Sequence, residues 1–96
     1  MNIKKESDWF RHNIMNKLSG FDVIEKSFPS GDFGALEQIE FNSDKISGNI
    51  DFWSLGWIGI LVWDREHEQE LMNILCEPSE KEKIEEAFNK LRLILQ

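Results

Sequence analysis

Cysteine is nearly absent from this sequence, since Cys76 is the one cysteine among 96 residues. A single cysteine excludes a disulfide within the chain and fits a reducing compartment. Long hydrophobic runs are also missing. The longest uncharged run, residues 52–63, contains two glycines and is too short to cross a bilayer as a helix. The first residues lack the apolar stretch of a signal peptide, so we expect a cytoplasmic protein.

Basic residues are scarce in the middle of the chain. Residues 27–80 contain two bases, Lys45 and Arg65, against eleven acids, and the whole chain has a net charge of −7. An acidic middle repels phosphate backbones, so nucleic-acid binding is not expected. It attracts a basic protein partner and speeds the encounter, although solubility alone also accounts for such charge.

Catalytic, metal and cofactor motifs are lacking as well. Residues 64–68 surround His67 with acids, but acids suit the first turn of a helix, and a single histidine makes a poor zinc site. Neither His12 nor His67 stands in a nucleophile motif, and no glycine-rich phosphate loop is present. The sequence therefore predicts no catalytic residue, no metal site, no cofactor and no membrane association, and we do not expect an enzyme.

The chain does contain short sequence patterns that are typical of β-strands. Residues 46–53 alternate apolar and polar side chains, residues 54–56 form a loop that ends in Gly56, and residues 57–63 are apolar on both faces. This pattern predicts a hairpin. Two further strands are predicted over residues 21–28 and 35–41. The connections are short, which favours an antiparallel meander.

Helical patterns flank the predicted strands. Residues 4–18 place Phe10, Ile14 and Leu18 on one stripe. Asp64 stands where a helix N-cap belongs, which predicts a helix that ends near Cys76. A capping box at residues 79–82 precedes the clearest stripe in the chain. The predicted fold is α+β: an N-terminal helix, a four-stranded antiparallel meander and two C-terminal helices packed on the sheet, in a single domain over residues 1–96.

The predicted hairpin has two apolar faces. One face carries Ile50, Phe52, Ile58, Ile60 and Val62, and the helices should pack there. The other face carries Asp51, Trp53, Trp57, Leu61 and Trp63. Three tryptophans form more apolar surface than a soluble protein leaves in water without a reason. Three interpretations stay open: a helix of this chain covers the face, a second copy covers it, or a different protein does.

One segment carries a family resemblance. Residues 48–58, GNIDFWSLGWI, followed by Asp64 and by Glu70 and Leu71, resemble small immunity proteins of bacterial toxin–immunity systems, such as contact-dependent growth-inhibition and polymorphic-toxin loci. The likeness covers about a third of the chain. It implies an antitoxin of the bacterial cytoplasm: a non-enzymatic monomer or homodimer that binds a cognate toxin domain, often a basic nuclease, and covers its active or substrate-binding surface.

An acidic inhibitor suits a basic toxin surface, since that surface otherwise binds phosphates. The acids and tryptophans of the hairpin and of the residues after it are therefore the predicted partner-binding set. Two alternatives remain: a small enzyme that uses Asp51, Asp64, Glu66 or His67 as acid and base, and a homo-oligomer held by the tryptophan face. The predicted partner-binding residues are Asp51, Trp53, Trp57, Trp63, Asp64, Glu66 and Glu68.

Overall fold

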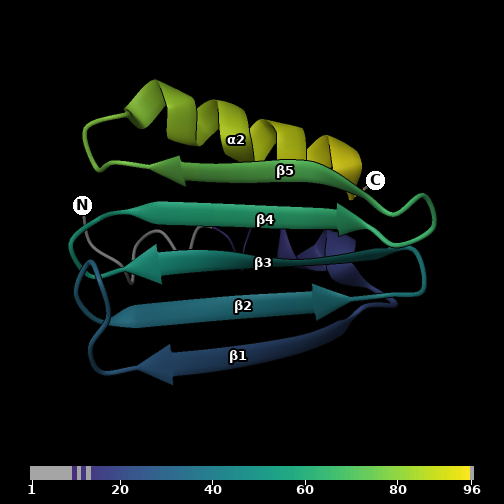
Figure 1. Ribbon diagram of the computed structural model, residues 1–96, viewed down its shortest axis with the longest axis horizontal. Coiled ribbons are helices and arrows are strands. Elements are labelled where there is room, and N and C mark those ends of the chain that lie inside the picture. The colour runs from purple at the N-terminus through teal and green to yellow at the C-terminus, as the bar shows by residue number, and fades with distance from the viewer. Residues whose placement is uncertain (1–9, 11, 13, 96) are drawn as a thin grey trace.

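The computed structural model describes Phe10, His12 and residues 14–95. Each strand pairs antiparallel with the next strand along the chain, which gives one five-stranded meander (Figure 1). A short 3-10 helix precedes the sheet, and one α-helix follows it. The elements in chain order are η1 (Met15–Leu18), β1 (Asp22–Phe28), β2 (Leu36–Asn42), β3 (Ile46–Trp53), β4 (Ile58–Asp64), β5 (Gln69–Cys76) and α2 (Lys81–Ile94).

The four predicted strands are confirmed to within one residue at each end, but the predicted fold was wrong in its helices. The structure has a fifth strand and a single C-terminal helix, where the sequence predicted four strands and two C-terminal helices. Residues 65–68 are a turn, and β5 takes the place of the predicted helix. Met72, Ile74 and Cys76 alternate toward the core, so a two-residue period runs through the same segment. Pairing with β4 satisfies the backbone hydrogen-bonding groups of both strands, and this favours a strand over a helix for residues 69–76.

The N-terminal helix predicted over residues 4–18 is wrong at its C-terminal end. In the part of that segment that the structure describes, Phe10 and His12 are helical and residues 15–18 form the 3-10 helix η1, while residues 1–9, 11 and 13 lie outside the described residues. The predicted stripe is nevertheless buried, because Phe10, Ile14 and Leu18 all belong to the core. The sequence therefore identified the buried side chains of this segment without fixing its conformation.

The C-terminal helix is confirmed, but its predicted cap is not. Ile84, Ala87, Phe88 and Leu91 are buried, as the stripe predicted. The N-cap position is Glu80, and no side-chain hydrogen bond caps the helix. The Glu80 carboxylate instead accepts from the backbone N–H of Glu77 at 2.8 Å, which closes the turn before the helix.

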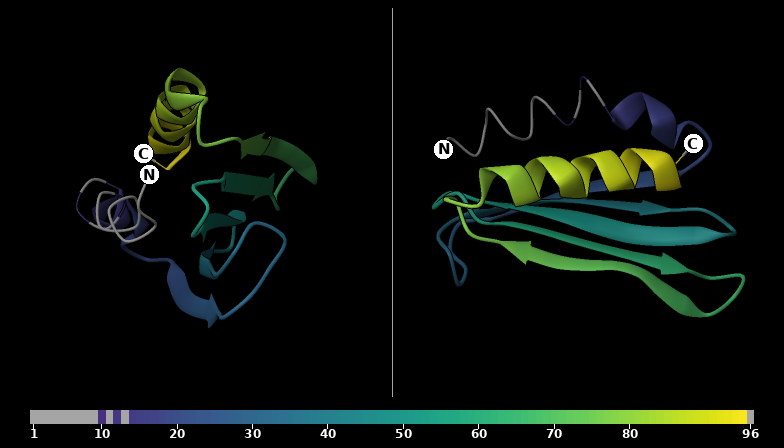
Figure 2. Two further views of the ribbon diagram at one scale, coloured as in Figure 1. Left: turned by 90° about the vertical axis from the view of Figure 1, so that its left-hand side faces the viewer. Right: turned by 90° about the horizontal axis from the view of Figure 1, so that it is seen from above.

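The sheet has one covered face and one open face. Both η1 and α2 lie on the same side of it, and no other described element lies on the opposite side (Figure 2). We call the covered side the inner face. Phe52 of β3 is central there, since its ring centroid lies 6.0 Å from that of Phe10 and 6.4 Å from that of Phe88. The inner-face strand residues of the core are Ile39, Phe41, Ile50, Phe52, Ile58, Ile60, Val62, Met72 and Cys76.

The turn between β3 and β4 includes residues 54–56, where the sequence predicted a loop. Gly56 has a φ of +94°, a conformation that glycine adopts without steric cost. Its N–H donates to the Trp53 carbonyl at 2.8 Å, and the Trp53 N–H donates to the Trp57 carbonyl at 3.1 Å. This tight turn fixes the register of the hairpin, and so decides which side chains of β3 and β4 share a face. Among the described residues, no helix combines the length and apolar character needed to span a membrane.

The two faces of β4 give a direct test of the fold. Ile60 is 2% exposed on the inner face, whereas its neighbour Leu61 is 39% exposed on the other side. Replacing Ile60 with Asp should lower the free energy of unfolding by about 3–5 kcal/mol, because a carboxylate is buried without a partner. Replacing Leu61 with Asp should lower it by less than about 1 kcal/mol. Chemical denaturation of both variants measures this difference, and equal losses would show that the faces are assigned wrongly.

Candidate functional site: the open sheet face

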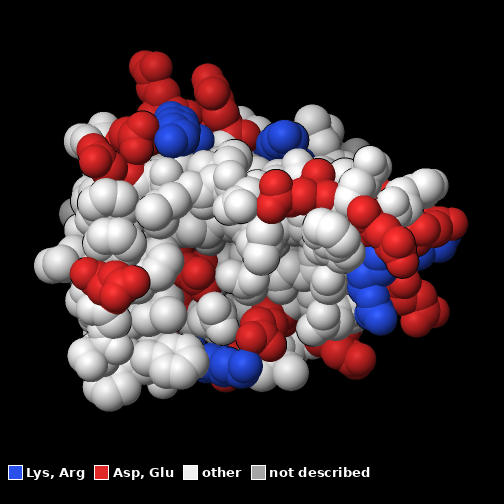
Figure 3. Space-filling model, viewed as in Figure 1, with Lys and Arg blue, Asp and Glu red and all other residues white. Residues whose placement is uncertain are grey.

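The side of the sheet that faces away from η1 and α2 is here called the outer face. Residues opposed across antiparallel strands point to the same side of a sheet, so the strand register defines this face. Figure 3 shows that it is largely uncharged and that red acids outnumber blue bases on it. Its main side chains are Ile24, Lys26, Phe28, Leu36, Gln38, Glu40, Asn42, Ser47, Asn49, Asp51, Trp53, Leu61, Trp63, Asn73 and Leu75.

Two of the predicted tryptophans, Trp53 and Trp57, pack against the same residue, Phe33, at the β3–β4 turn. The ring of Phe33 stacks on Trp57 with centroids 4.0 Å apart and meets Trp53 edge-on at 5.2 Å. Trp53 also lies over Gly59, where an added Cβ would come within 3.2 Å of its ring. We call Phe33, Trp53 and Trp57 the aromatic cluster. Because its members are half-buried against each other, part of their surface stabilises the turn.

Trp63 lies apart from the aromatic cluster and is more exposed. Its side chain is 41% exposed on β4, where it opposes Ser47 of β3. Leu61, two residues earlier on the same strand, opposes Asn49. Their neighbours on β3 are short and polar, so the indole and the leucine stand above the adjoining strand. Of the predicted partner-binding tryptophans, Trp63 is the one with the largest accessible surface.

Asp51 occupies the middle of the outer face and is held by two amides. Its Oδ1 accepts from Gln38 Nε2 at 2.7 Å and from Asn49 Nδ2 at 3.2 Å. Gln38 opposes Asp51 across the β2–β3 pair, and Asn49 precedes it by two residues on the same face. A half-buried carboxylate with two amide donors keeps a fixed orientation on this face.

The remaining predicted residues belong to the β4–β5 turn. The Oδ1 atom of Asp64 accepts from the backbone N–H groups of Glu66 and His67, both at 3.0 Å, and its Oδ2 lies 2.9 Å from His67 Nδ1. These are the bonds of an N-cap, but they close a turn, and Glu68 at a φ of +53° leads the chain into β5. Asp64 is thus engaged within the turn, while Glu66 and Glu68 are exposed at the end of the sheet.

The same hydrogen bonds shift two pKa values. The backbone N–H of His67, followed by its ring, holds the pKa of Asp64 below its ordinary value of 3.8. The hydrogen bond that the His67 ring donates to the Asp64 carboxylate, with the nearby Asp64 and Glu66 charges, raises the pKa of His67 above 6.5. Each group favours the charged form of the other, so the pair behaves as a surface ion pair.

Of the four acid–base candidates, Asp64, Glu66 and His67 meet in the β4–β5 turn, but Asp51 lies apart from them. Asp64 opposes Ile46, whereas Asp51 opposes Gly59 on the other face, five residues further along β3 or roughly 17 Å away. The His67 side chain is 66% exposed in the turn. Burial raises the pKa of the Cys76 thiol, which disfavours the reactive thiolate. Among the described residues, no three His, Cys, Asp or Glu side chains are grouped as metal ligands.

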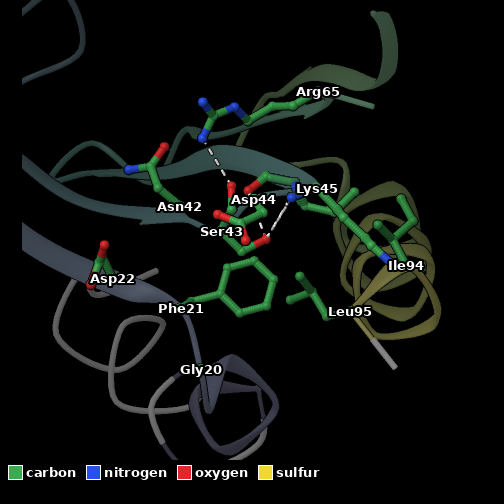
Figure 4. Close-up of a pocket in the computed structure, with 11 residues that line it drawn as sticks. Gly20, Phe21, Asp22, Asn42, Ser43, Asp44, Lys45, Arg65, Ile94 and Leu95 are labelled. Atoms are coloured by element: carbon green, nitrogen blue, oxygen red, sulfur yellow. Dashed lines mark hydrogen bonds between the residues drawn. The ribbon is translucent and has the colours of Figure 1, made fainter. Parts of the chain in front are cut away.

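An open groove of about 500 Å³ lies at the end of the sheet where η1 and α2 finish. Figure 4 shows Phe21 and Leu95 on one side of the β2–β3 turn and Arg65 on the other. The Arg65 guanidinium donates to the Ser43 carbonyl at 2.9 Å, which links this turn to the β4–β5 turn. The lining carries cations and acids in equal number, Lys45 and Arg65 beside Asp22 and Asp44. Its charges favour no particular ligand.

The sequence placed Asp51, Trp53, Trp57 and Trp63 on one face. The strand register puts Asp51, Trp53 and Trp63 on the outer face, while Trp57 lies in the β3–β4 turn and stacks on Phe33. The prediction missed the contributions of the neighbouring strand, chiefly Gln38 and Glu40 of β2. Alternation along β2 gave a usable signal, but the register between β2 and β3 is set by the turn between them. Comparison of this chain with models of protein families, with curated proteins and with solved structures finds no match.

The two kinds of tryptophan predict different effects on stability. Replacing Trp53 with Ala removes contacts with Phe33 and Gly59 and should lower the free energy of unfolding by about 2 kcal/mol. Replacing Trp63 with Ala should lower it by less than about 1 kcal/mol, because Trp63, 41% exposed, is more accessible than Trp53 and is not a member of the aromatic cluster. Urea unfolding followed by circular dichroism compares the two variants. A larger loss for Trp63 would mean that this ring is part of the core.

The Asp64–His67 pair predicts a defined pH dependence. Because the folded pKa of His67 is raised and that of Asp64 is lowered, the pair stabilises the fold fully between pH 3.8 and pH 6.5. This stabilisation falls as the pH rises through the folded pKa of His67, and as the pH falls through the folded pKa of Asp64. In Asp64→Asn the pKa of His67 should fall toward 6.5, whereas in Glu68→Gln it should stay close to that of the parent chain. NMR titration of the His67 ring protons measures both, and an unchanged pKa in Asp64→Asn would contradict the assigned cause.

Proposed function

We propose that this protein is an immunity-type inhibitor that binds a basic toxin domain, such as a nuclease, in the bacterial cytoplasm and covers its active or substrate-binding surface. The observation that carries the proposal is the outer face. No described helix or strand covers it, and it exposes the indole of Trp63 and the side chain of Leu61. Exposed apolar side chains that adjoin one another mark binding surfaces in soluble proteins, and tryptophan is enriched among residues that dominate binding energy.

The charges around the outer face favour a cationic partner. Glu40 and Asp51 lie on the face itself, and Glu66, Glu68 and Glu70 lie at the end of β4 and the start of β5. The one cation among the outer-face side chains of the strands, Lys26, is paired with Glu40 at 2.9 Å. An acidic rim attracts a basic surface over a distance of about one screening length, roughly 8 Å at physiological salt.

The family resemblance coincides with this surface. Residues 48–58, which resemble immunity proteins, form most of β3, the turn and the start of β4. They supply Asp51 and Trp53 to the outer face and Trp57 to the turn at its edge. The segment that resembles inhibitors of toxins therefore contributes part of the open face and two of the three members of its aromatic cluster.

A homo-oligomer is the second candidate, and the edge strand β1 favours it. All seven residues of β1 are exposed, and they include the large apolar side chains Val23, Ile24 and Phe28. An exposed edge strand can pair with a second copy of the chain. Light scattering at high protein concentration distinguishes the candidates, because a monomeric mass removes the homo-oligomer. A dimer that the Trp63→Ala substitution dissociates would instead assign the outer face to self-association.

The direct test of the proposal uses the neighbouring gene. A toxin-like reading frame beside this gene should encode a domain that arrests growth when expressed alone and does not when this protein is coexpressed. The purified domain should form a complex with this protein. A neighbouring toxin that still arrests growth, and that shows no binding, would contradict the proposal.

Charge should govern how fast the complex forms. Replacing Glu66 and Glu68 together by Lys should slow association and leave dissociation nearly unchanged, because exposed rim charges act on the encounter. The matched control replaces Glu85 and Glu86 of α2 by Lys, which changes the net charge equally on an exposed helix face away from the outer face. Surface-plasmon kinetics at two salt concentrations separates these effects. An on-rate indifferent to salt, or equally slowed by the α2 control, would contradict steering by the outer-face rim.

Anchoring should depend on Trp63. Replacing Trp63 with Ala should speed dissociation by an amount typical of an interface hot spot, about 2 kcal/mol or more. A melting curve of the same variant serves as the control, since its stability should change little. Unchanged dissociation kinetics would place the contact surface elsewhere.

A further inference from the structure

A small hollow lies on the outer face, above β3 and between β2 and β4. Two rows of opposed residues frame it: Glu40, Asn49 and Leu61 in one row, and Asn42, Ser47 and Trp63 in the next. Each row takes one side chain from each of three neighbouring strands. The short side chains of β3 form the floor, while Glu40 and Asn42 rise on one side and Leu61 and Trp63 on the other. The hollow is thus a direct product of the strand register.

Its size suits a single side chain. The volume is about 180 Å³, whereas pockets for small-molecule ligands and cofactors range from roughly 300 to 1,000 Å³. The walls are also unequal in character, since one is polar and acidic and the other is apolar. An occupant should therefore be elongated, with an apolar stem and a polar end.

The polar wall and floor offer acceptors to a cation. Lys26 donates to the Oε1 atom of Glu40 at 2.9 Å, which leaves the Oε2 atom to accept from another donor. The Asn49 amide nitrogen donates to Asp51, and its side-chain oxygen is an acceptor for another donor. The lining contains Glu40 as its charged residue and no base. A phosphate or carboxylate is therefore disfavoured here, and a cation is favoured.

The apolar wall suits the rest of the same occupant. The exposed indole of Trp63 attracts a cation through its ring face, and this attraction is stronger for tryptophan than for other aromatic residues. Leu61 offers apolar surface to the methylene stem of a long basic side chain. A guanidinium group combines a flat face for stacking with several donors for a carboxylate, whereas an ammonium group has no such face.

We propose that this hollow seats one arginine side chain of the protein partner, with its guanidinium between the Trp63 indole and the Glu40 carboxylate. This inference rests on the proposed function and adds the chemistry that the partner must present. It places the anchor of the interface at the β2–β3–β4 centre of the outer face, and leaves the aromatic cluster at its edge.

The hollow can be tested without the partner. N-acetyl-arginine methylamide is titrated into the isotope-labelled protein, with the uncharged isostere N-acetyl-citrulline methylamide as the matched ligand. The arginine probe should produce saturable NMR shifts at the Trp63 indole N–H, the Leu61 methyl groups and the Asn49 side-chain amide. The citrulline probe should not. Equal shifts with both probes, shifts that do not saturate, or shifts confined to other surfaces would overturn the proposal.

Variants assign the binding to the two walls. Glu40→Gln and Trp63→Ala should each weaken binding of the arginine probe roughly two- to fivefold, as expected for one exposed ion pair or cation–π contact. Glu85→Gln removes the same charge on the exposed side of α2, away from the hollow, and should bind the probe as the parent chain does. Equal weakening in Glu85→Gln would reduce the effect to net charge and overturn the proposal.

The same variants separate this inference from the proposed function. If a toxin domain binds the parent chain, Glu40→Gln should weaken that complex more than Glu85→Gln does. If Glu40→Gln and Trp63→Ala leave the affinity of the complex unchanged, the arginine site is contradicted while the proposed inhibitor function stands. If the probe binds saturably but no toxin domain forms a complex, the inhibitor function is contradicted while the arginine site stands.

Discussion

Burial of the inner face of the β3–β4 hairpin is the interaction on which the rest of this structure depends. Ile50 and Phe52 of β3 and Ile60 of β4 are almost completely buried beneath η1 and α2. Side chains alternate between the two faces of a strand, so this burial also dictates what the opposite face carries. A shift of one residue in register would exchange the two sets. The Gly56 turn prevents that exchange by fixing the pairing of the two strands.

The outer face follows from that constraint and divides into two parts. At the β3–β4 turn, Trp53 and Trp57 both pack on the ring of Phe33, so much of their apolar surface is buried within the chain. Toward the other end of β4, Trp63 and Leu61 stand over polar residues of β3 and remain accessible. A tryptophan-rich sequence thus contributes both to the stability of the turn and to an available surface. The acids around this surface favour a partner of opposite charge.

The sequence predicted most of the sheet because its signals there are local. Alternation and a glycine-bearing turn placed β3 and β4, and the helical stripe placed α2. The error at residues 64–76 arose because two periods coexist: Leu71 and Leu75 fit a helix, whereas Met72 and Cys76 fit a strand. Asp64 makes the hydrogen bonds of a helix cap in either case. Pairing with β4 is a non-local interaction, and no local pattern reports it.

The candidate site was predicted in part for the same reason. Alternation along β4 put Trp63 on the outer face. The position of Glu40 beside Asn49 depends instead on the register between β2 and β3. Hydroxyl-radical footprinting of the complex with the neighbouring toxin domain tests the central claim, that the outer face is the binding surface. Oxidation of Trp63 and Leu61 should fall on binding, while that of Leu93, 68% exposed on α2, should not change. Protection of Leu93 with unchanged oxidation of Trp63 would contradict the account.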